Sequence, residues 1–141
     1  MSVVLFTDRD LGRMFPQRLR AAGLSVEAHG DHFAPACPDA EWLEAVTRRG
    51  WVAVTHDARI RYKPNELAAV KRARARLLVL VGKAAHMALA ESFVHTWPQI
   101  ETFIDLHQPP FIAKVYRPSP TDLAKQLMPP GRIELWYPKP E

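Results

Sequence analysis

The sequence predicts an α/β domain with a mostly parallel central sheet that helices cover on both faces. Short apolar runs of four or five residues alternate along the chain with longer segments whose apolar residues recur at helical spacing. The short runs are continuously apolar, which is typical of strands that are buried on both faces of a parallel sheet. A chain of 141 residues has the length of one such domain.

The N-terminal part follows a strand, helix, strand pattern. Residues 3–6 predict the first strand, and residues 11–23 predict an amphipathic helix that ends at a glycine. Pro16 is compatible with this helix only in its first turn. Residues 25–28 predict a short second strand, and residues 29–38 form a loop rich in glycine and proline.

The middle of the chain continues the alternation. We expect a helix over residues 39–50, a strand over 51–54, a basic helix over most of 65–74 and a strand over 77–81. A longer helix follows from about residue 87 to 106. We expect Pro98 to kink or divide it, because proline removes a backbone donor from the helix interior.

The C-terminal part differs in composition. Eight of the 13 prolines fall between residues 109 and 140, and the apolar stretches "FIAKVYR" and "RIELWY" predict short edge strands or a hairpin. The sequence therefore divides into a core, residues 1–108, and a Pro-rich C-terminal extension, residues 109–141. We expect this extension to pack on the core as an appendage.

Composition narrows the class of protein. Cys37 is the single cysteine, so the chain has no internal disulfide. Charged residues interrupt the first apolar run after residue 6, unlike a secretion signal, and the longest apolar run, residues 77–81, is far shorter than a membrane span. We expect a cytoplasmic protein that is not membrane-bound.

The positive charge is concentrated in one segment. Lys and Arg number 19 against 15 Asp and Glu, and residues 59–76 contain seven of these cations but a single acid, Glu66. Such a segment attracts polyanions such as nucleic acid. It is equally typical of a solvated helix face, so both interpretations stay open.

Carboxylates follow two of the buried strands. Asp8 comes soon after the first strand and Asp57 soon after the third, while Asp39 begins the helix that leads back to the third strand. All three are expected at the carboxyl edge of the sheet, where ligands bind in such folds. One of them alone would be an ordinary helix cap. Three converging carboxylates repel one another unless a cation binds, and an oxygen-only ligand set favours Mg²⁺ or Mn²⁺.

The order of three motifs resembles the PIN-like nucleases. The motifs are "FTDRDLGR", "DHFAPACPDAEWL" and "WVAVTHDARIRYKP", and the resemblance covers roughly residues 3–81. It is closest in kind to the small bacterial PIN-like proteins grouped with the ribonuclease toxins of toxin-antitoxin pairs. The resemblance implies a three-layer α/β/α fold and a metal-dependent ribonuclease. It makes Asp8, Asp39 and Asp57 the catalytic residues and the ligands of Mg²⁺ or Mn²⁺, with Thr55 orienting the site.

The resemblance also implies a substrate and partners. The substrate is RNA, hydrolysed to a 5′-phosphate and a 3′-hydroxyl, and the expected partners are an antitoxin protein and a second copy of the chain in a homodimer. Cations beside the acids are the candidates for holding the RNA backbone, and Tyr62 is available to stack on a base. These nucleic-acid-binding candidates are Arg9, Arg13, Arg59, Arg61 and Lys63.

The sequence departs from the PIN pattern at Arg59. PIN domains often carry a fourth acid there, so either three acids suffice or Asp10, Asp31 or Glu41 completes the site. The departure also supports an alternative, a non-catalytic PIN-like module that binds RNA or a protein.

A receiver-like phosphoacceptor domain is a second alternative. The acidic pair Asp8 and Asp10 would follow its first strand, and Asp57 would be the phosphoacceptor. Such a domain needs a lysine after its fifth strand, and Lys114 lies inside an apolar run instead.

Overall fold

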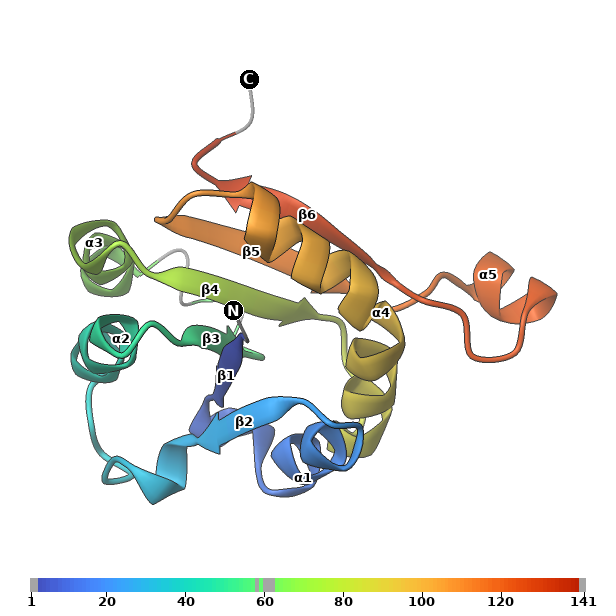
Figure 1. Ribbon diagram of the computed structural model, residues 1–141, viewed down its shortest axis with the longest axis horizontal. Coiled ribbons are helices and arrows are strands. Elements are labelled where there is room, and N and C mark those ends of the chain that lie inside the picture. The colour runs from blue at the N-terminus through green and yellow to red at the C-terminus, as the bar shows by residue number, and fades with distance from the viewer. Residues whose placement is uncertain (1–2, 58, 60–62, 140–141) are drawn as a thin grey trace.

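A six-stranded sheet in the order β2-β1-β3-β4-β5-β6 forms the centre of the protein (Figure 1). The computed structural model describes residues 3–57, 59 and 63–139. The first five strands pair in parallel, and β6 runs antiparallel to β5. The strands are β1 (Val4–Thr7), β2 (Ser25–Ala28), β3 (Val52–Thr55), β4 (Arg76–Val81), β5 (Phe111–Tyr116) and β6 (Arg132–Tyr137).

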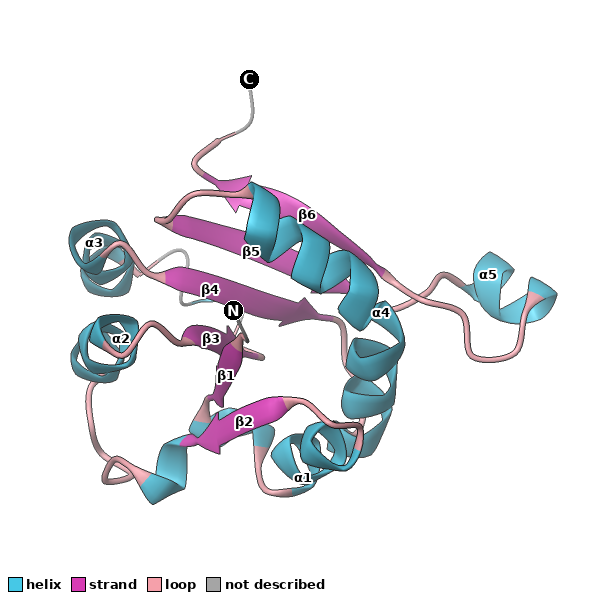
Figure 2. Cartoon of the chain, in the orientation of Figure 1, coloured by secondary structure: helices cyan, strands magenta, loops and turns pink. Residues whose placement is uncertain are grey.

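Helices cover both faces of this sheet, which confirms the expected three-layer α/β/α architecture. One layer contains α1 and α4 and the other contains α2 and α3, whereas α5 lies outside both layers (Figure 2). The helices are α1 (Met14–Ala21), α2 (Asp39–Arg48), α3 (Pro64–Ala73), α4 (His86–Leu106) and α5 (Pro120–Lys125), with short 3-10 turns η1 (Arg9–Leu11) and η2 (His29–Asp31). None of the helices described has the length and apolar character needed to cross a membrane.

Strand β1 contributes to both hydrophobic cores. Leu5 packs in the cluster under α1 and α4, and Phe6 packs in the cluster under α2 and α3. Because successive side chains of a strand point to opposite faces, Thr7 lies on the α1 side and Asp8 lies on the α2 side. This alternation places the two polar residues at the end of β1 in different surroundings.

The first predicted helix begins later than expected. The chain makes the 3-10 turn η1 and then passes through Gly12, which has a φ of 65°, before α1 begins at Met14. A positive φ favours glycine, and a Cβ at Gly12 would lie 2.9 Å from Nδ1 of His86. Pro16 falls in the first turn of α1, as the sequence requires.

Helix α4 is continuous through Pro98, so of the two expected effects of this proline, a kink or a division, the division does not occur. The Thr102 hydroxyl donates a hydrogen bond to the Pro98 carbonyl, 3.0 Å away. Packing against the sheet outweighs the loss of one backbone donor. The buried side chains of α4 are Leu89, Ala90, Phe93, Thr96, Ile100, Phe103 and Ile104.

The C-terminal segment adds two strands to the central sheet. β5 pairs with β4 along its whole length, and β6 pairs with β5 and forms the edge. The predicted strands therefore exist, but β5 is an interior strand and not an edge strand. Between them, residues 117–131 carry α5 and return at Gly131, where a Cβ would clash with the Tyr116 carbonyl oxygen.

Candidate functional site

The site begins at the end of β1. Asp8 follows the strand directly, and its backbone N–H donates to the Val54 carbonyl 2.9 Å away, so it continues the ladder between β1 and β3. Its side chain is only 9% exposed. A carboxylate in this position has lost much of its hydration and needs donors or a cation to offset that loss.

Thr55, the last residue of β3, supplies one donor. Its hydroxyl lies 2.7 Å from Oδ2 of Asp8 and accepts a hydrogen bond from the backbone N–H of Asp57 at 3.1 Å. Thr55 is fully buried. One hydroxyl thus connects the carboxylate after β1 to the chain after β3, as expected for a residue that orients the site.

Asp10 is the fourth acid at this place. Turn η1 brings it back over the end of β3, where the backbone N–H of His56 donates to its Oδ2 at 3.1 Å. The other two acids considered for this role lie elsewhere. Asp31 is 3.9 Å from Arg20 and lines a neighbouring cavity, while Glu41 accepts a hydrogen bond from the thiol of Cys37 at 3.5 Å.

Four carboxylates therefore line one cavity of about 410 Å³ at the carboxyl edge of the sheet, which we call the acid cavity. Asp8, Asp39 and Asp57, the three acids named from the sequence, are brought together there, and Asp10 joins them. Three basic side chains line the same cavity. The charged residues of the acid cavity are Asp8, Asp10, Asp39, Asp57, Arg9, Arg59 and Lys63.

Two of these carboxyl groups hold their protons more strongly than usual. Burial raises the pKa of Asp8, and the charge of Asp39 raises it further against the lowering effect of the Thr55 hydrogen bond. Burial and the charge of Asp8 raise the pKa of Asp10 to about 6. Crowded, partly desolvated carboxylates of this kind favour a bound cation, because the cation removes the repulsion between them.

Asp57 is in a different electrostatic state. Burial alone would raise its pKa, but hydrogen bonds from the backbone and side chain of Arg59, with the charges of Arg59 and Lys63, lower it. The Arg59 side chain lies 3.2 Å from Oδ1 of Asp57 and the Lys63 amine lies 3.7 Å from Oδ2. Asp57 is therefore ionised and already paired with cations.

Asp39 is held by its own helix. It occupies the first turn of α2, where a negative charge is favoured, and its Oδ1 accepts a hydrogen bond from the indole N–H of Trp42 at 2.9 Å. One oxygen of this carboxylate is thereby fixed at the wall of the acid cavity.

The acid cavity fits a hard divalent cation by the chemistry of its donors. The carboxylates supply oxygen ligands, and the raised pKa values of Asp8 and Asp10 reflect burial first and then repulsion, from Asp39 at Asp8 and from Asp8 at Asp10. Within the described residues, however, no three Asp, Glu, His or Cys side chains are arranged to contact one ion together. The ligands lie around one cavity without forming a ready-made cluster.

The predicted nucleic-acid-binding residues divide between two cavities. Arg9, Arg59 and Lys63 line the acid cavity, and Arg9 and Arg13 line a second cavity beside it. Arg61 and Tyr62 lie outside the described residues, so their predicted roles stay predictions.

The basic segment is split by the fold. Arg59 and Lys63 are at the acid cavity. Helix α3 leads away from it, so the later cations of the segment lie towards the opposite edge of the sheet; these are Lys71, Arg72, Arg74 and Arg76. There Arg74 donates to the Pro109 carbonyl and Arg76 to the Gly50 carbonyl, each at 2.7 Å. Only the first part of this segment therefore lies beside the acids, because the length of α3 separates its two ends.

Sequence reasoning missed His29 as part of the site. This residue is 3% exposed, lines both cavities, and packs its ring near Phe6 and Trp42. Burial lowers the pKa of its imidazole, with the nearby charge of Asp8 opposing that effect. The loop that contains His29 has no periodic pattern, so the sequence offers no signal for its placement.

A mostly parallel sheet between two helical layers, with four carboxylates and several cations at its carboxyl edge, is the architecture that the sequence predicted. Comparison with protein families agrees: residues 3–82, more than half of the chain, match the family described as a PIN like domain. The chain belongs to the PIN-like domain family. Searches of curated proteins and of solved structures found no match.

Proposed function

We propose that the chain is a metal-dependent ribonuclease of the PIN-like class, which hydrolyses phosphodiester bonds of RNA. The observation that carries the proposal is the convergence of four carboxylates, from three segments of the chain, on one cavity with Arg9, Arg59 and Lys63 in its wall. An acidic site alone would repel a polyanion, and the cationic rim offsets that repulsion. The family match supports the same assignment, because PIN-like domains are often nucleases.

Asp8, Asp10, Asp39 and Asp57 are the residues that would hold Mg²⁺ or Mn²⁺ in this proposal. When bound, such an ion supplies a water of lowered pKa and stabilises negative charge on the attacked phosphate. Thr55 would fix the orientation of the Asp8 carboxylate through its 2.7 Å hydrogen bond. Positioning of this kind matters, because ligands that are already oriented lose less freedom when the ion binds.

The two cations beside Asp57 have a second part in the proposal. Arg59 and Lys63 pair with Asp57 in the free protein. RNA phosphates would compete for these cations, and their departure would leave the Asp57 carboxylate available as a ligand. In the free protein, therefore, the four acids share a cavity, but among the described residues no three of them are arranged around one ion. In the proposal, RNA binding would release Asp57 from its cations and so complete the ligand set.

Partners and cellular setting are further parts of the proposal and rest on the resemblance to toxin-antitoxin ribonucleases. The partners are an antitoxin protein and a second copy of the chain, and the setting is the cytoplasm. Light scattering of the purified protein tests the homodimer, for which we expect twice the monomer mass of 16.0 kDa. A monomer mass at micromolar concentration would contradict this part alone.

A non-catalytic PIN-like binding module is the second candidate. The pairing of Asp57 with two cations favours it, since such a module needs no free carboxylate there. The receiver-like alternative is not favoured by the structure, because Lys114 lies within β5 with its amine 5.6 Å from the ring of Tyr116.

Cleavage of a mixed RNA pool by the purified protein tests the proposal. We expect cleavage with Mg²⁺ or Mn²⁺, none with EDTA, and a loss of at least 100-fold, on the order of one essential charged group, in Asp8→Asn and in Asp57→Asn. Asp105→Asn, which removes an exposed acid near the end of α4, is the matched control and should cleave normally.

The same variants separate the two candidates. In the binding module, Asp57→Asn retains or raises RNA affinity and no protein form cleaves. Metal-dependent cleavage that is unchanged in both Asp8→Asn and Asp57→Asn would overturn the site assignment itself.

A further inference from the structure

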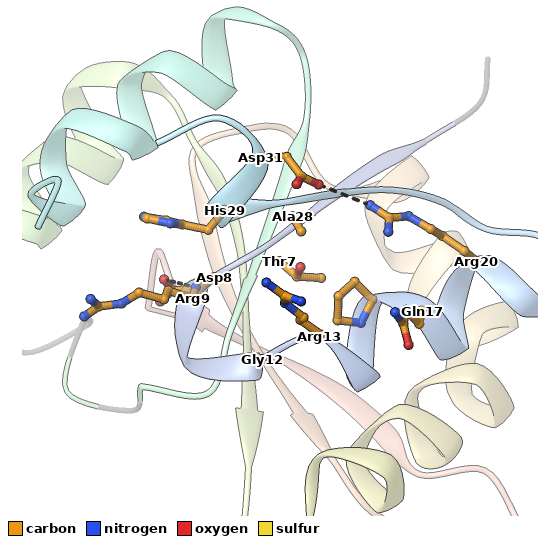
Figure 3. Close-up of a pocket in the computed structure, with 12 residues that line it drawn as sticks. Thr7, Asp8, Arg9, Gly12, Arg13, Gln17, Arg20, Ala28, His29 and Asp31 are labelled. Carbon is orange, nitrogen blue, oxygen red and sulfur yellow. Dashed lines mark hydrogen bonds and ion pairs between the residues drawn. The ribbon is translucent and has the colours of Figure 1, made fainter. Parts of the chain in front are cut away.

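We propose that a second cavity, directly beside the acid cavity, binds one nucleotide of single-stranded RNA next to the phosphate that is cleaved. Figure 3 shows this cavity, with Arg13 and Thr7 in the centre of the view and Arg20 facing Asp31. The inference rests on the proposed ribonuclease function and adds a subsite to it. We call this cavity the nucleotide cavity.

The two cavities are adjacent and share part of their wall. The nucleotide cavity has a volume of about 440 Å³ and shares Asp8, Arg9 and His29 with the acid cavity. This volume lies in the range of cavities that hold small organic ligands. A strand whose phosphate lies at the acids would therefore place its neighbouring nucleotide here.

Charge in the nucleotide cavity favours an anion. The side chain of Arg13 makes no hydrogen bond and no ion pair with any residue that the structure describes, so its guanidinium is available to a ligand. Arg20 is held in place by two hydrogen bonds to the Val26 carbonyl, at 3.1 and 3.0 Å. Its contact with Asp31 is long, 3.9 Å, and exposed, so it neutralises little of the charge.

Two buried polar atoms in the cavity wall lack partners. Among the described residues, Oγ1 of Thr7 and Nδ1 of His29 make no hydrogen bond, although the two residues are 1% and 3% exposed. Buried polar groups are nearly always paired in folded proteins, and an unpaired one costs free energy. A ligand with donors and acceptors would satisfy them.

The rest of the wall suits a base. Pro16 and Ala28 present apolar surface, and the exposed side-chain amide of Gln17 offers both a donor and an acceptor. A nucleotide combines the three properties that this wall complements: an anionic phosphate, a flat apolar ring and polar ring edges.

The assignment gives the RNA a path across the site. Arg59 and Lys63 belong to the acid cavity alone, Arg13 and Arg20 belong to the nucleotide cavity alone, and Asp8 lies in the wall common to both. The strand would run from the first pair of cations past Asp8 to the second pair. Asp8 would then face the phosphate between the two cationic pairs.

Binding of a 5′-fluorescein-labelled pentauridylate in EDTA, followed by fluorescence anisotropy, tests this subsite without any cleavage. For Arg13→Ala/Arg20→Ala we expect affinity to fall roughly tenfold or more, and the slope of log K against log salt to shrink by about 1.4, or 0.7 for each lost phosphate contact. The matched control is Arg48→Ala/Arg72→Ala, which removes two exposed arginines from the ends of α2 and α3 at the opposite sheet edge.

A second variant, which leaves the net charge of the protein unchanged, tests the subsite separately from any general loss of electrostatic attraction. Thr7→Val keeps the shape of the side chain and removes the unpaired hydroxyl, and we expect it to weaken pentauridylate binding severalfold while leaving the fold intact. Equal losses of affinity in the two double variants, or undiminished binding by both Arg13→Ala/Arg20→Ala and Thr7→Val, would overturn the proposal.

The outcome is separable from that of the ribonuclease proposal. Loss of binding in Arg13→Ala/Arg20→Ala, with no metal-dependent cleavage by the unaltered protein, would retain the subsite and refute the nuclease. Cleavage that needs Asp8 and Asp57, with binding unaffected by the cavity variants, would retain the nuclease and refute the subsite.

Discussion

The Thr55 hydroxyl lies 2.7 Å from the Asp8 carboxylate, although 47 residues separate the two along the chain. The contact follows from the sheet: β1 and β3 are adjacent and parallel, and Thr7 is in register with Val54. Asp8 and Thr55, one position further along each strand, therefore meet at the carboxyl edge. A contact that the sheet register dictates is held rigidly, as a positioning contact must be.

Thr55→Val should destabilise the protein by about 1–3 kcal/mol, because it removes the donor to a buried carboxylate. Thr7→Val is the matched control on the neighbouring strand. Thr7 is buried to the same degree but its hydroxyl has no partner within the described residues, so its removal should leave stability unchanged or slightly raised. Urea unfolding of both variants measures the difference. Equal destabilisation of the two would refute the role assigned to the Thr55 hydrogen bond.

Asp10→Asn should stabilise the protein at pH 7 by about 1 kcal/mol, with solvent screening of this partly exposed group taken into account. The pKa of Asp10 is raised from 3.8 to about 6 in the folded state. Between these values the unfolded chain binds fewer protons than the folded chain, so stability falls as pH rises through this window. At pH 4 the carboxyl is protonated when folded, and most of the advantage of asparagine disappears.

Urea unfolding at pH 7 and at pH 4 checks this dependence. Asp105→Asn, at an exposed position, should show no comparable change between the two pH values. A stabilisation by Asp10→Asn that is the same at both pH values would contradict the raised pKa.

Lys63→Ala and Lys71→Ala should separate the two halves of the basic segment. Lys63 lines the acid cavity, whereas the Lys71 amine lies 5.2 Å from the ring of Tyr137, towards the other end of α3. We expect Lys63→Ala to weaken RNA binding severalfold and Lys71→Ala to leave it unchanged. Anisotropy titrations with one labelled RNA compare them directly, and equal losses would indicate a single extended basic surface instead.

Arg59→Ala should raise the pKa of Asp57, because it removes the hydrogen bond and the charge that outweigh the effect of burial. Carbon-detected NMR of the carboxyl groups follows this titration. Arg72→Ala, which removes the partner of Glu44, is the control and should leave Asp57 unaffected. If Asp57 titrates at the same pH in Arg59→Ala as in the parent, the pairing is not what holds it ionised.

Much of the fold was predictable from the sequence. Continuous apolar runs located β1, β3 and β4, because burial on both faces of a sheet leaves this pattern, and helical spacing located α1 to α4 to within a few residues. Helix α5, in the Pro-rich segment, was not predicted. The sequence was less informative where tertiary packing, and not local preference, determines the course of the backbone. Pro98 breaks a local rule of helix formation, yet the buried side chains of α4 keep the helix continuous.

The site was predictable in part, for a topological reason. Asp8 and Asp57 follow parallel strands, so their meeting at one sheet edge depends only on the fold class. Selecting Asp10 over Asp31 and Glu41 required the η1 turn, whose geometry depends on Gly12 and the start of α1. Predicting which basic residues line the acid cavity required the length and direction of α3, and these cannot be read from the composition of the segment.

Calorimetric titration with Mn²⁺ tests most directly the central claim that the four carboxylates form one metal-holding site. We expect the parent protein to bind Mn²⁺, and we expect Asp8→Asn and Asp57→Asn each to weaken that binding tenfold or more, as loss of a charged ligand does. Asp105→Asn should bind like the parent. Absence of Mn²⁺ binding by the parent, with and without a non-hydrolysable RNA analogue, or binding that is equal in all variants, would contradict the account.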